Sequence, residues 1–526
     1  MASTTRKTIS NKKFKFKNTV EKFLAVTGVL VVGLTLAAAV YSIGFSQNST
    51  VNASESNNYL SRNFNRRTPT PTPTATPIPT PSTQGTTRYV SKTGSNSNLG
   101  TLSAPWATLT YAAGMLNPGD TLYIRGGVYN EKVTFAKSGI AGAPIMIAAY
   151  PGEKPVIDGS INGQYVLPSA TSRYSALVKF AGSYINVEGL EVRNSLWQGI
   201  VISGEKVTLT HVTSHDHMEQ GILGWESKDL IVQDSIIYNN AKSLENGVYN
   251  FPDRTSYATG LSAGRGASRS AFLRNTIYNN WGEGLSSYNA TKTVMEDNVV
   301  YDNAKNIYIS DTTDNIVQRN LVYCTPGNKY RLSSVVTQHG INLQDENQQP
   351  PSANNKIINN MVVGCVTNFK WYPYTSNSAM TGTLVAHNTF VNATGTTSDA
   401  AFTIAAPVGI AHSTTRIFNN IIVQEDSKAI GSITGNLNGV SFSNNLWSKT
   451  PPPSMMGSNS KIGDPILFKT SSITPGGLKG SYFKVQPNSP AINAGAWLPE
   501  VTNDFFKISR PINGYDIGGQ EFDNSY

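Results

Sequence analysis

The sequence predicts an all-β parallel β-helix, a solenoid in which each turn of chain, or rung, adds one short strand to each of several sheets. A pattern of alternating apolar and polar residues followed by a turn recurs through the chain, as at 272–280 and 295–303. Uninterrupted copies are 22 or 23 residues apart. That period is too short for a propeller blade, and the copies lack the helical half of a leucine-rich repeat.

The N-terminal part of the chain is expected to lie outside this fold. Residues 1–22 form a basic tail, and residues 23–45 follow without a single charge. At about 1.5 Å per residue this apolar run spans a hydrocarbon core of roughly 30 Å. We therefore expect a transmembrane helix or signal anchor, with its basic flank in the cytoplasm and the large domain outside the cell. A cleaved signal peptide, which gives a secreted protein, is the alternative. Residues 46–87 are rich in Ser, Asn, Thr and Pro and predict a disordered stalk.

Charge is concentrated in the same N-terminal part. Of 42 basic and 33 acidic residues, residues 1–87 hold ten and two, which leaves the rest of the chain with a net charge of +1. A nucleic-acid-binding protein would carry a basic surface on its folded part. The distribution therefore argues against a nucleic-acid partner and against simple electrostatic capture of a polyanion. We expect a monomer that contacts the membrane only through residues 23–45.

One column of the repeat is almost entirely asparagine. Asparagine at an inward turn position can form a ladder, in which each side-chain amide bonds to the rungs above and below. We assign this column a structural role and no chemistry. Its members are Ser235, Asn275, Asn298, Asn320, Asn360, Asn388, Asn420 and Asn445.

A second short strand follows in each copy and begins with glycine or asparagine. We expect the apolar residue after each start to point inward. The glycine itself then faces outward and leaves the backbone bare for a flat ligand, or it only provides a turn with positive φ. The starts are Gly199, Gly221, Gly260, Gly284, Asn306 and Gly340.

Segments near both ends of the domain resemble a known family. Residues 88–113 and 117–133, with the string GDTLYIRGGVY, are similar to the N-terminal cap of bacterial right-handed β-helix proteins, and residues 147–160 continue the match. The strings NSPAINAG and SRPINGYDIGGQEF resemble the closing module of surface-anchored β-helix proteins. On these motifs the chain is identified as a member of the pectin-lyase-like superfamily. The resemblance implies a right-handed single-stranded parallel β-helix with its N-terminal cap at 88–450 and a C-terminal capping module at 451–526. This fold hosts lyases, hydrolases and non-catalytic adhesins.

Two polar columns flank the second strands. Because neighbouring rungs stack about 4.8 Å apart, residues of one column in consecutive rungs can touch. One residue before the strand start lie Gln198, Gln220, Thr259, Glu283, Lys305 and His339. Five residues after it lie Gly204, Glu226, Arg265, Asn289, Asp311 and Asp345.

The first column contains candidate catalytic groups. Glu283 beside Lys305 is either a surface ion pair or, together with His339, a set of acid–base partners. In the second column, Asp311 and Asp345 would repel each other unless a cation or a shared proton joined them, so we expect a Ca²⁺ site or an acid–base pair. Displacement of Asp345 by the insertion before its strand is the alternative.

Arg265 is the candidate base or clamp for a uronate carboxylate, because a guanidinium binds a carboxylate through two hydrogen bonds. Six residues of strand separate the two columns, so one reaction centre cannot use both. We place the centre on the Arg265, Asp311 and Asp345 edge. Outward aromatic residues, Trp225, Tyr288 and Tyr308, with Asn289, are candidate sugar contacts; such aromatic residues are also common on surfaces without a function.

The resemblance is weaker at the residues that carry activity. Pectate-type lyases of this fold use Ca²⁺-binding carboxylates and a basic residue that removes the proton next to a uronate carboxylate. Here Thr259, Gly282 and Glu283 stand where adjacent aspartates are expected, so that calcium site is not reproduced. The Gly-His-Gly of related polygalacturonases compares with the string Gln-His-Gly at 338–340, and the downstream Arg-x-Lys is missing.

Two further groups of residues have open alternatives. The string His-Asp-His-Met-Glu at 215–219 gathers two imidazoles and two acids, which suggests zinc, although third and fourth ligands cannot be named. Cys324 and Cys365 fall in consecutive copies of the repeat and form either a disulfide or two buried thiols.

Two classes of function follow from these features. One is a carbohydrate-active enzyme, a polysaccharide lyase rather than a hydrolase, that binds an extracellular glycan and cleaves a uronic-acid glycan by β-elimination. The other is a non-catalytic surface adhesin or structural rod.

Overall fold

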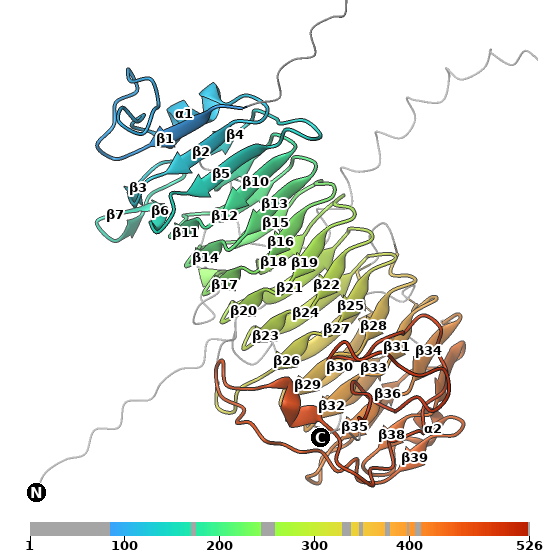
Figure 1. The fold of residues 1–526 in the computed structure, drawn as a ribbon. Coiled ribbons are helices and arrows are strands. Elements are labelled where there is room, and N and C mark those ends of the chain that lie inside the picture. The colour runs from blue at the N-terminus through green and yellow to red at the C-terminus, as the bar shows by residue number, and fades with distance from the viewer. Residues whose placement is uncertain are drawn as a thin grey trace, which may run out of the picture. The chain divides into compact units, whose positions relative to one another are not determined.

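A computed structural model describes residues 85–523, except for 170–174, 243–257, 329–337, 347–350, 374–378, 397–398 and 406–411. The chain winds as a solenoid whose rungs stack their strands into three parallel sheets, A, B and C (Figure 1). Sheets A and B have 13 strands each and sheet C has 11. The parallel β-helix is therefore confirmed. It has more rungs than the eight copies that define the asparagine column, because weakly patterned segments at both ends also pair.

Sheet A begins at the N-terminal end of the described chain. Its strands, in spatial order, are β1 (Thr87–Val90), β2 (Thr121–Ile124), β5 (Ile145–Ala149), β10 (Ile185–Glu188), β13 (Val207–Thr210), β16 (Ile231–Gln233), β19 (Ala271–Leu273), β22 (Val294–Glu296), β25 (Ile316–Gln318), β28 (Lys356–Ile358), β31 (Leu384–Ala386), β34 (Thr415–Phe418) and β37 (Val440–Ser443).

From β2 onward, the chain passes into sheet B after each sheet A strand. Its strands are β3 (Gly127–Tyr129), β6 (Pro155–Asp158), β11 (Glu191–Arg193), β14 (Thr213–His215), β17 (Ile236–Tyr238), β20 (Thr276–Tyr278), β23 (Val299–Tyr301), β26 (Leu321–Tyr323), β29 (Met361–Val363), β32 (Thr389–Val391), β35 (Ile421–Val423), β38 (Leu446–Trp447) and β39 (Lys461–Ile462).

Sheet C contains the second strands of the repeat. Its strands are β4 (Val133–Phe135), β9 (Ala176–Phe180), β12 (Gln198–Ile202), β15 (Ile222–Gly224), β18 (Thr259–Ala263), β21 (Glu283–Tyr288), β24 (Lys305–Ser310), β27 (His339–Asp345), β30 (Thr367–Pro373), β33 (Phe402–Ala405) and β36 (Gly431–Thr434). All six second strands that the sequence indicates therefore belong to one sheet.

Few other elements occur in the described residues. Helix α1 (Leu109–Met115) buries Leu109 and two alanines near the N-terminal end. The rest are helix α2 (Pro453–Met456), the short hairpin of β7 (Ser160–Ile161) and β8 (Gln164–Tyr165), and a 3₁₀ turn at Gly480–Phe483. No helix in this part of the chain is long and apolar enough to cross a membrane. The expected tail, membrane span and all but the last three residues of the stalk lie outside the described residues.

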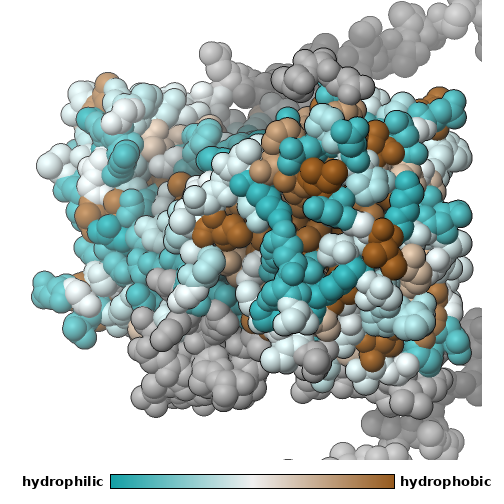
Figure 2. Space-filling model, turned by 90° about the horizontal axis from the view of Figure 1, so that it is seen from below, coloured by the Kyte–Doolittle hydropathy of each residue, from teal (hydrophilic) through white to brown (hydrophobic). Residues whose placement is uncertain are grey.

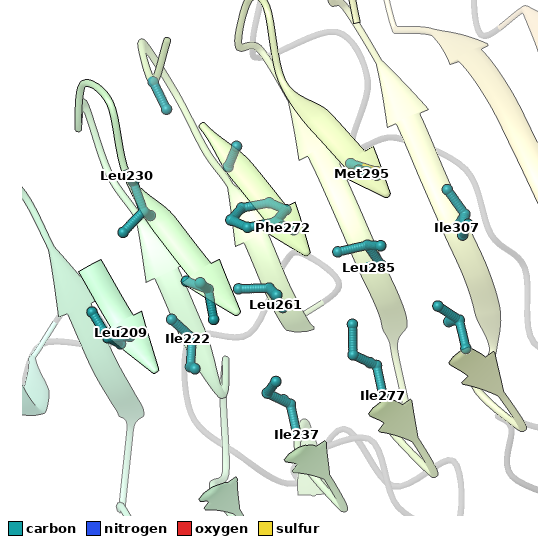
Figure 3. Packing of buried hydrophobic residues seen from close by; sticks show 14 of the residues in the cluster. Leu209, Ile222, Leu230, Ile237, Leu261, Phe272, Ile277, Leu285, Met295 and Ile307 are labelled. Carbon is teal, nitrogen blue, oxygen red and sulfur yellow. The ribbon is translucent and has the colours of Figure 1, made fainter. Parts of the chain in front are cut away.

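Aliphatic and aromatic side chains from all three sheets fill the interior. Phe272 of sheet A, Ile277 of sheet B and Leu285 of sheet C are fully buried, and equivalent residues of the next rungs stack on them (Figure 3). Each rung covers the apolar face of the one before it, which is why short strands suffice. On the face drawn in Figure 2, hydrophobic residues lie as separate groups among polar ones.

The predicted asparagine ladder is present between sheets A and B. The Asn298 side-chain oxygen accepts hydrogen bonds from the Asn275 backbone N–H (2.9 Å) and side-chain amide (3.1 Å). Its own amide donates to the Phe272 carbonyl (2.9 Å) and to the Asn320 side-chain oxygen (2.9 Å). The same arrangement continues to Asn445, so the structural role is confirmed.

A second asparagine ladder lies between sheets B and C, and it corrects the expectation for the glycine column. The amides of Asn280 and Asn303 point toward that column. A Cβ on Gly284 would lie 2.5 Å from Asn303 Nδ2, and a Cβ on Gly260 would lie 2.7 Å from Asn280 Nδ2. These glycines therefore point inward, without positive φ, and make room for the amides.

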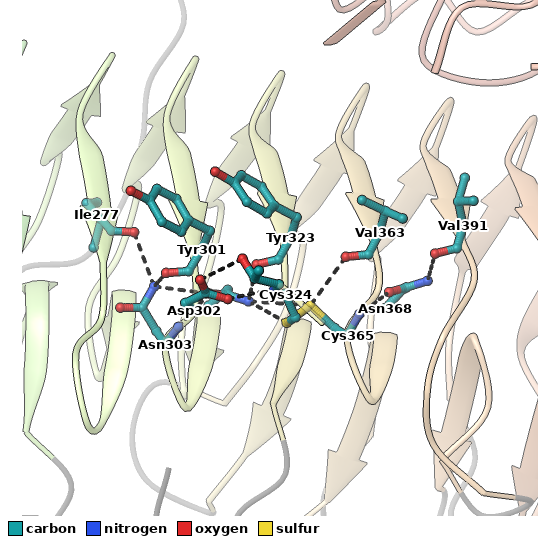
Figure 4. The surroundings of a disulfide bond; sticks show 12 residues. Ile277, Tyr301, Asp302, Asn303, Tyr323, Cys324, Val363, Cys365, Asn368 and Val391 are labelled. Carbon is teal, nitrogen blue, oxygen red and sulfur yellow. Dashed lines mark hydrogen bonds between the residues drawn. A yellow bond between two sulfur atoms is a disulfide. The ribbon is translucent and has the colours of Figure 1, made fainter. Parts of the chain in front are cut away.

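The second ladder ends at a disulfide. Cys324 and Cys365 are bonded, which decides between the two alternatives for the cysteines (Figure 4). Asn306 occupies a glycine-column position and accepts from Asn303, and its amide donates to Cys324 Sγ at 3.2 Å. The disulfide therefore lies next to the inward-facing Asn306 of β24, the strand that also carries Lys305.

The C-terminal module packs along the outward face of sheet B. Tyr238, Tyr278, Tyr301 and Tyr323 form a stack of nearly parallel rings on that face. The module covers the last two rings with apolar residues that include Leu467. Its Gly476 N–H also donates to the Tyr323 hydroxyl at 2.9 Å. The module thus protects the side of the solenoid as well as its end.

Candidate active site on sheet C

Polar side chains form three columns on the outward face of sheet C. The residues between them, such as Leu285 and Ile307, point into the core. The register places Ser262, Ser286, Tyr308, Asn342, Lys370 and Thr403 in the central column. Thr259, Glu283, Lys305, His339 and Thr367 form the column on one side, and Tyr288, Ser310, Gln344 and Tyr372 form the column on the other. Ionisable groups therefore gather on β21, β24, β27 and β30.

Glu283 and Lys305 are direct cross-strand neighbours in this array. Lys305 Nζ lies 3.8 Å from Glu283 Oε1, and the two side chains are only 17% and 8% exposed. Lys305 Nζ also lies over the ring of Tyr308, 4.0 Å from its centroid. The pair is therefore shielded from solvent and packed against an aromatic ring, unlike a solvated surface ion pair.

Burial changes the proton affinity of both groups. It raises the pKa of Glu283 to about 7; the Lys305 charge opposes this shift and the Glu346 charge adds to it. Burial lowers the pKa of Lys305, against the attraction of Glu283 and Glu346. Both shifts favour the neutral forms, a carboxylic acid and an amine. This arrangement can accept a proton at one atom and donate one from a neighbouring atom.

Tyr308 connects this pair to the opposite column. Its hydroxyl donates to Glu346 Oε1. The Glu346 backbone N–H in turn donates to both carboxylate oxygens of Asp311, at 3.1 and 3.2 Å. The Ser310 hydroxyl donates to Asp311 Oδ2 at 2.8 Å. Asp311 therefore positions Glu346, which fixes the tyrosine beneath Lys305. Burial and the charges of Glu283 and Glu346 hold the pKa of Tyr308 well above its usual value.

The expected calcium pair has a different role in the structure. Asp311 directly follows β24 and Asp345 ends the neighbouring strand β27. Both are buried, but Asp311 accepts the hydrogen bonds above and Asp345 Oδ2 accepts one from the Ser352 N–H (3.4 Å). Within the described parts of the chain, no three His, Cys, Asp or Glu side chains converge as metal ligands. Thr259 and Ser286 add only hydroxyl groups to the columns. The donor set described here does not fit a calcium ion.

Arg265 is not in the column to which the sequence assigned it. Its rung contains one extra residue after β18, so Gly266 (φ 78°) occupies the left-handed corner that Asn289 and Asp311 (both φ 52°) occupy in later rungs. Arg265 is exposed and precedes that corner. Its charge lowers the pKa of Tyr288, although burial and nearby acids raise that pKa to about 12 overall. Arg265 therefore remains near the site as an exposed cation.

The other predicted contacts lie on the same sheet. His339 is buried and pairs in register with Lys305. Tyr288 and Trp225 are half-buried, and Trp225 packs against Leu223 and its apolar neighbours. The structure thus brings Glu283, Lys305, Tyr308 and His339 together and leaves Trp225 nearer the N-terminal end.

The expected zinc ligands diverge. His215 lies on the outward face of sheet B and contacts Asp216 at 2.7 Å. His217 points inward, where it accepts a hydrogen bond from the Ser195 N–H at 3.0 Å. Burial lowers the pKa of His217 to about 3, so it stays neutral. The two imidazoles therefore do not form a metal site.

Comparisons with known proteins agree with this fold. Residues 88–317 match the model of a family described as the Pel9A-like right-handed β-helix region. The solved structure of pectate lyase Pel9A superimposes with a TM-score of 0.51 at 19% identity, over 84% of this chain and 98% of that one. The chain is a right-handed parallel β-helix protein that is similar to the pectin-lyase-like proteins.

Curated relatives of this β-helix protein include four pectate lyases by name and the uncharacterized protein YwoF of Bacillus subtilis. Pectate lyase PEL9 of Emericella nidulans is 27% identical over 219 residues, which is 39% of this chain and 50% of the relative. Pectate lyase L of Dickeya chrysanthemi is 30% identical over 143 residues, which is 26% of this chain and 32% of the relative. The chain spans half or less of the length of the curated relatives that it matches.

Three residues of the site lie outside the columns that the sequence repeat of this β-helix protein indicates. Glu346 directly follows β27, beyond the columns that the repeat indicates. Lys370 and Asp399, which pair at 2.7 Å, lie in rungs whose glycine start is absent. Alignment of the segment at 367–373 with β24 and β27 would have placed Lys370 in the column of Tyr308 and Asn342.

Proposed function

We propose that this protein is a lyase that cleaves a uronic-acid polysaccharide by β-elimination on the outward face of sheet C. The observation that carries the proposal is the shielded Glu283–Lys305 pair, in which burial moves the pKa values of both groups toward the neutral forms. The pectate lyase names of the relatives support the same class of reaction.

The pair can supply both proton transfers of the reaction. In its amine form, which burial favours, Lys305 removes the C5 proton next to the uronate carboxyl group, and the electron pair of that bond forms the C4–C5 double bond. The C4–O4 bond breaks, and the carboxylic acid of Glu283 gives its proton to the leaving oxygen. Lys305 is then an ammonium and Glu283 a carboxylate, so one proton transfer between them restores the starting state.

Neighbouring groups assist these steps. The face of the Tyr308 ring stabilises the ammonium that forms on Lys305. We assign Arg265 to the substrate carboxylate, because a guanidinium binds a carboxylate through two hydrogen bonds. Lys370 is less suited to that task because it already pairs with Asp399. Tyr288 and Trp225 are the proposed sugar contacts, and His339 extends the acid–base column.

The test is incubation of the full-length protein with a panel of uronic-acid polysaccharides. We expect growth of the ultraviolet absorbance of a conjugated unsaturated uronate, and products whose combined mass equals that of the substrate. Products heavier by one water would show hydrolysis instead. Binding without any cleavage would favour the adhesin or rod, in which the same pair is only an ion pair of the scaffold.

We propose further that residues 23–45 hold the protein in the cell membrane with the β-helix outside. The charge-free run and the basic residues before it support this orientation. Membrane fractionation and mass spectrometry of the mature N-terminus test it. A mature chain that begins after residue 39 and stays in the medium would show a secreted protein.

A further inference from the structure

We infer that the uronate cleaved carries its C5 hydrogen and its C4 oxygen on the same face of the sugar ring, as in mannuronate and glucuronate polysaccharides. This inference rests on the proposed function and concerns the stereochemistry of the same site. It separates these substrates from galacturonate and guluronate polysaccharides, in which the two atoms lie on opposite faces.

The geometry that carries the inference is the closeness of the acid and the base. Glu283 and Lys305 belong to one column of adjacent strands and project from the same face of sheet C. Their functional atoms, Oε1 and Nζ, are 3.8 Å apart. Both groups therefore approach a bound sugar from the same side.

The reach of a proton transfer decides which elimination fits this distance. A base must come within roughly 3 Å of the carbon that loses the proton, and an acid within roughly 3 Å of the leaving oxygen. When these two bonds point to opposite faces, the ring lies between the groups and they must be roughly 6 Å apart or more. When the bonds point to one face, groups about 3–4 Å apart can serve both. The separation of catalytic groups reports stereochemistry by the same logic in glycoside hydrolases.

The site holds the pair at this separation. Lys305 lies against the Tyr308 ring, and the tyrosine hydroxyl is bound by Glu346. Glu346 is fixed in turn through its backbone N–H by Asp311. Strand pairing on both sides fixes the backbone of Glu283 and of Lys305. Widening the pair to the distance that an opposite-face elimination needs would break the contact of Lys305 with the ring.

Two pairs of epimeric polysaccharides test the inference on the full-length protein. Polymannuronate and polyguluronate differ at C5, and polyglucuronate and polygalacturonate differ at C4. We expect initial rates of unsaturated product at least tenfold higher on the first member of each pair. The rates on polymannuronate and polyglucuronate should fall together in Lys305→Met, because one base serves both.

Each outcome has a distinct meaning. Equal or faster cleavage of polyguluronate or polygalacturonate would overturn the same-face inference and leave the lyase proposal standing. Cleavage of the same-face substrates that survives in Lys305→Met would also overturn it, because the elimination would then not use this pair. Absence of unsaturated product on all four polymers would overturn the proposed function, and the inference with it.

Discussion

At the scale of single residues, the composition of the site depends on whether each side chain lies at the position that the repeat assigns to it. Register from β21 to β30 is regular, so Glu283, Lys305 and His339 lie where the repeat places them. One extra residue in the rung of Arg265 moves the left-handed corner to Gly266, and counting from the strand start could not detect it. The protonation of Glu283 could not be predicted either, because it depends on burial.

Glu283 should make stability depend on pH. Its pKa is raised from 4.5 to about 7, so its stabilising contribution is complete below pH 4.5 and is lost as the pH rises through 7. The free energy of unfolding falls by up to about 3 kcal/mol over this range. Glu283→Gln lacks this titration, so the wild type should lose stability relative to the variant between pH 4.5 and pH 8. Urea unfolding of both proteins measures the difference, and a difference that stays constant with pH would contradict the assignment.

At the scale of elements, the two asparagine ladders set the bends between the sheets. The first ladder could be predicted because its asparagine recurs in seven copies, each within the same short alternating pattern. The second was missed because its members, Asn240, Asn280 and Asn303, are few and Asn306 takes over from the neighbouring column. The glycine column then has a physical explanation, which is space for the amides of that ladder.

Asn298→Ala should be strongly destabilising. The substitution removes the acceptor of the Asn275 N–H and the donor to the Phe272 carbonyl, and both groups stay buried. We expect a loss of about 2–4 kcal/mol in the free energy of unfolding. Asn186→Ala, on the outward face of β10, is the matched control. Similar losses in the two variants would argue against a structural role for the ladder.

Gly284→Ala tests the inward glycine column. Its Cβ would lie 2.5 Å from Asn303 Nδ2 and 2.8 Å from the Asn306 carbonyl oxygen, so we expect a loss of about 1–3 kcal/mol. In Gly114→Ala, within α1, the Cβ meets no atom within 4 Å, and this variant should be neutral or slightly more stable. Thermal unfolding of the two variants compares them; an unchanged Gly284→Ala would contradict the inward orientation.

At the scale of the whole molecule, the C-terminal module is joined to the solenoid by a buried charge. The Arg510 side chain is 0% exposed and donates to Glu521 (2.7 Å) within the module and to Asn359 (3.0 Å) of the β-helix. The sequence motif indicated a closing module. The sequence does not show that the module lies along sheet B, because the contacts join residues about 150 positions apart.

Arg510→Met should weaken this attachment. The substitution leaves Glu521 buried beside other acids without its cation. We expect it to lower the free energy of unfolding by about 3–5 kcal/mol. The control is Arg416→Met, because Arg416 is far more exposed where it pairs with Glu500 and should contribute about 1 kcal/mol or less. Limited proteolysis should release the module faster in Arg510→Met alone. Equal protection in both variants would show that apolar packing is sufficient.

The most direct test of the account is the rate of unsaturated product formation by Lys305→Gln on a polysaccharide that the wild type cleaves. Lys356→Gln, on β28 of sheet A, controls for loss of a lysine elsewhere on the solenoid. If the Glu283–Lys305 pair carries out the elimination, Lys305→Gln should be slower by roughly 10²–10⁴-fold and Lys356→Gln unchanged, with both proteins folded. Wild-type rates in folded Lys305→Gln would contradict the assignment of the active site to sheet C.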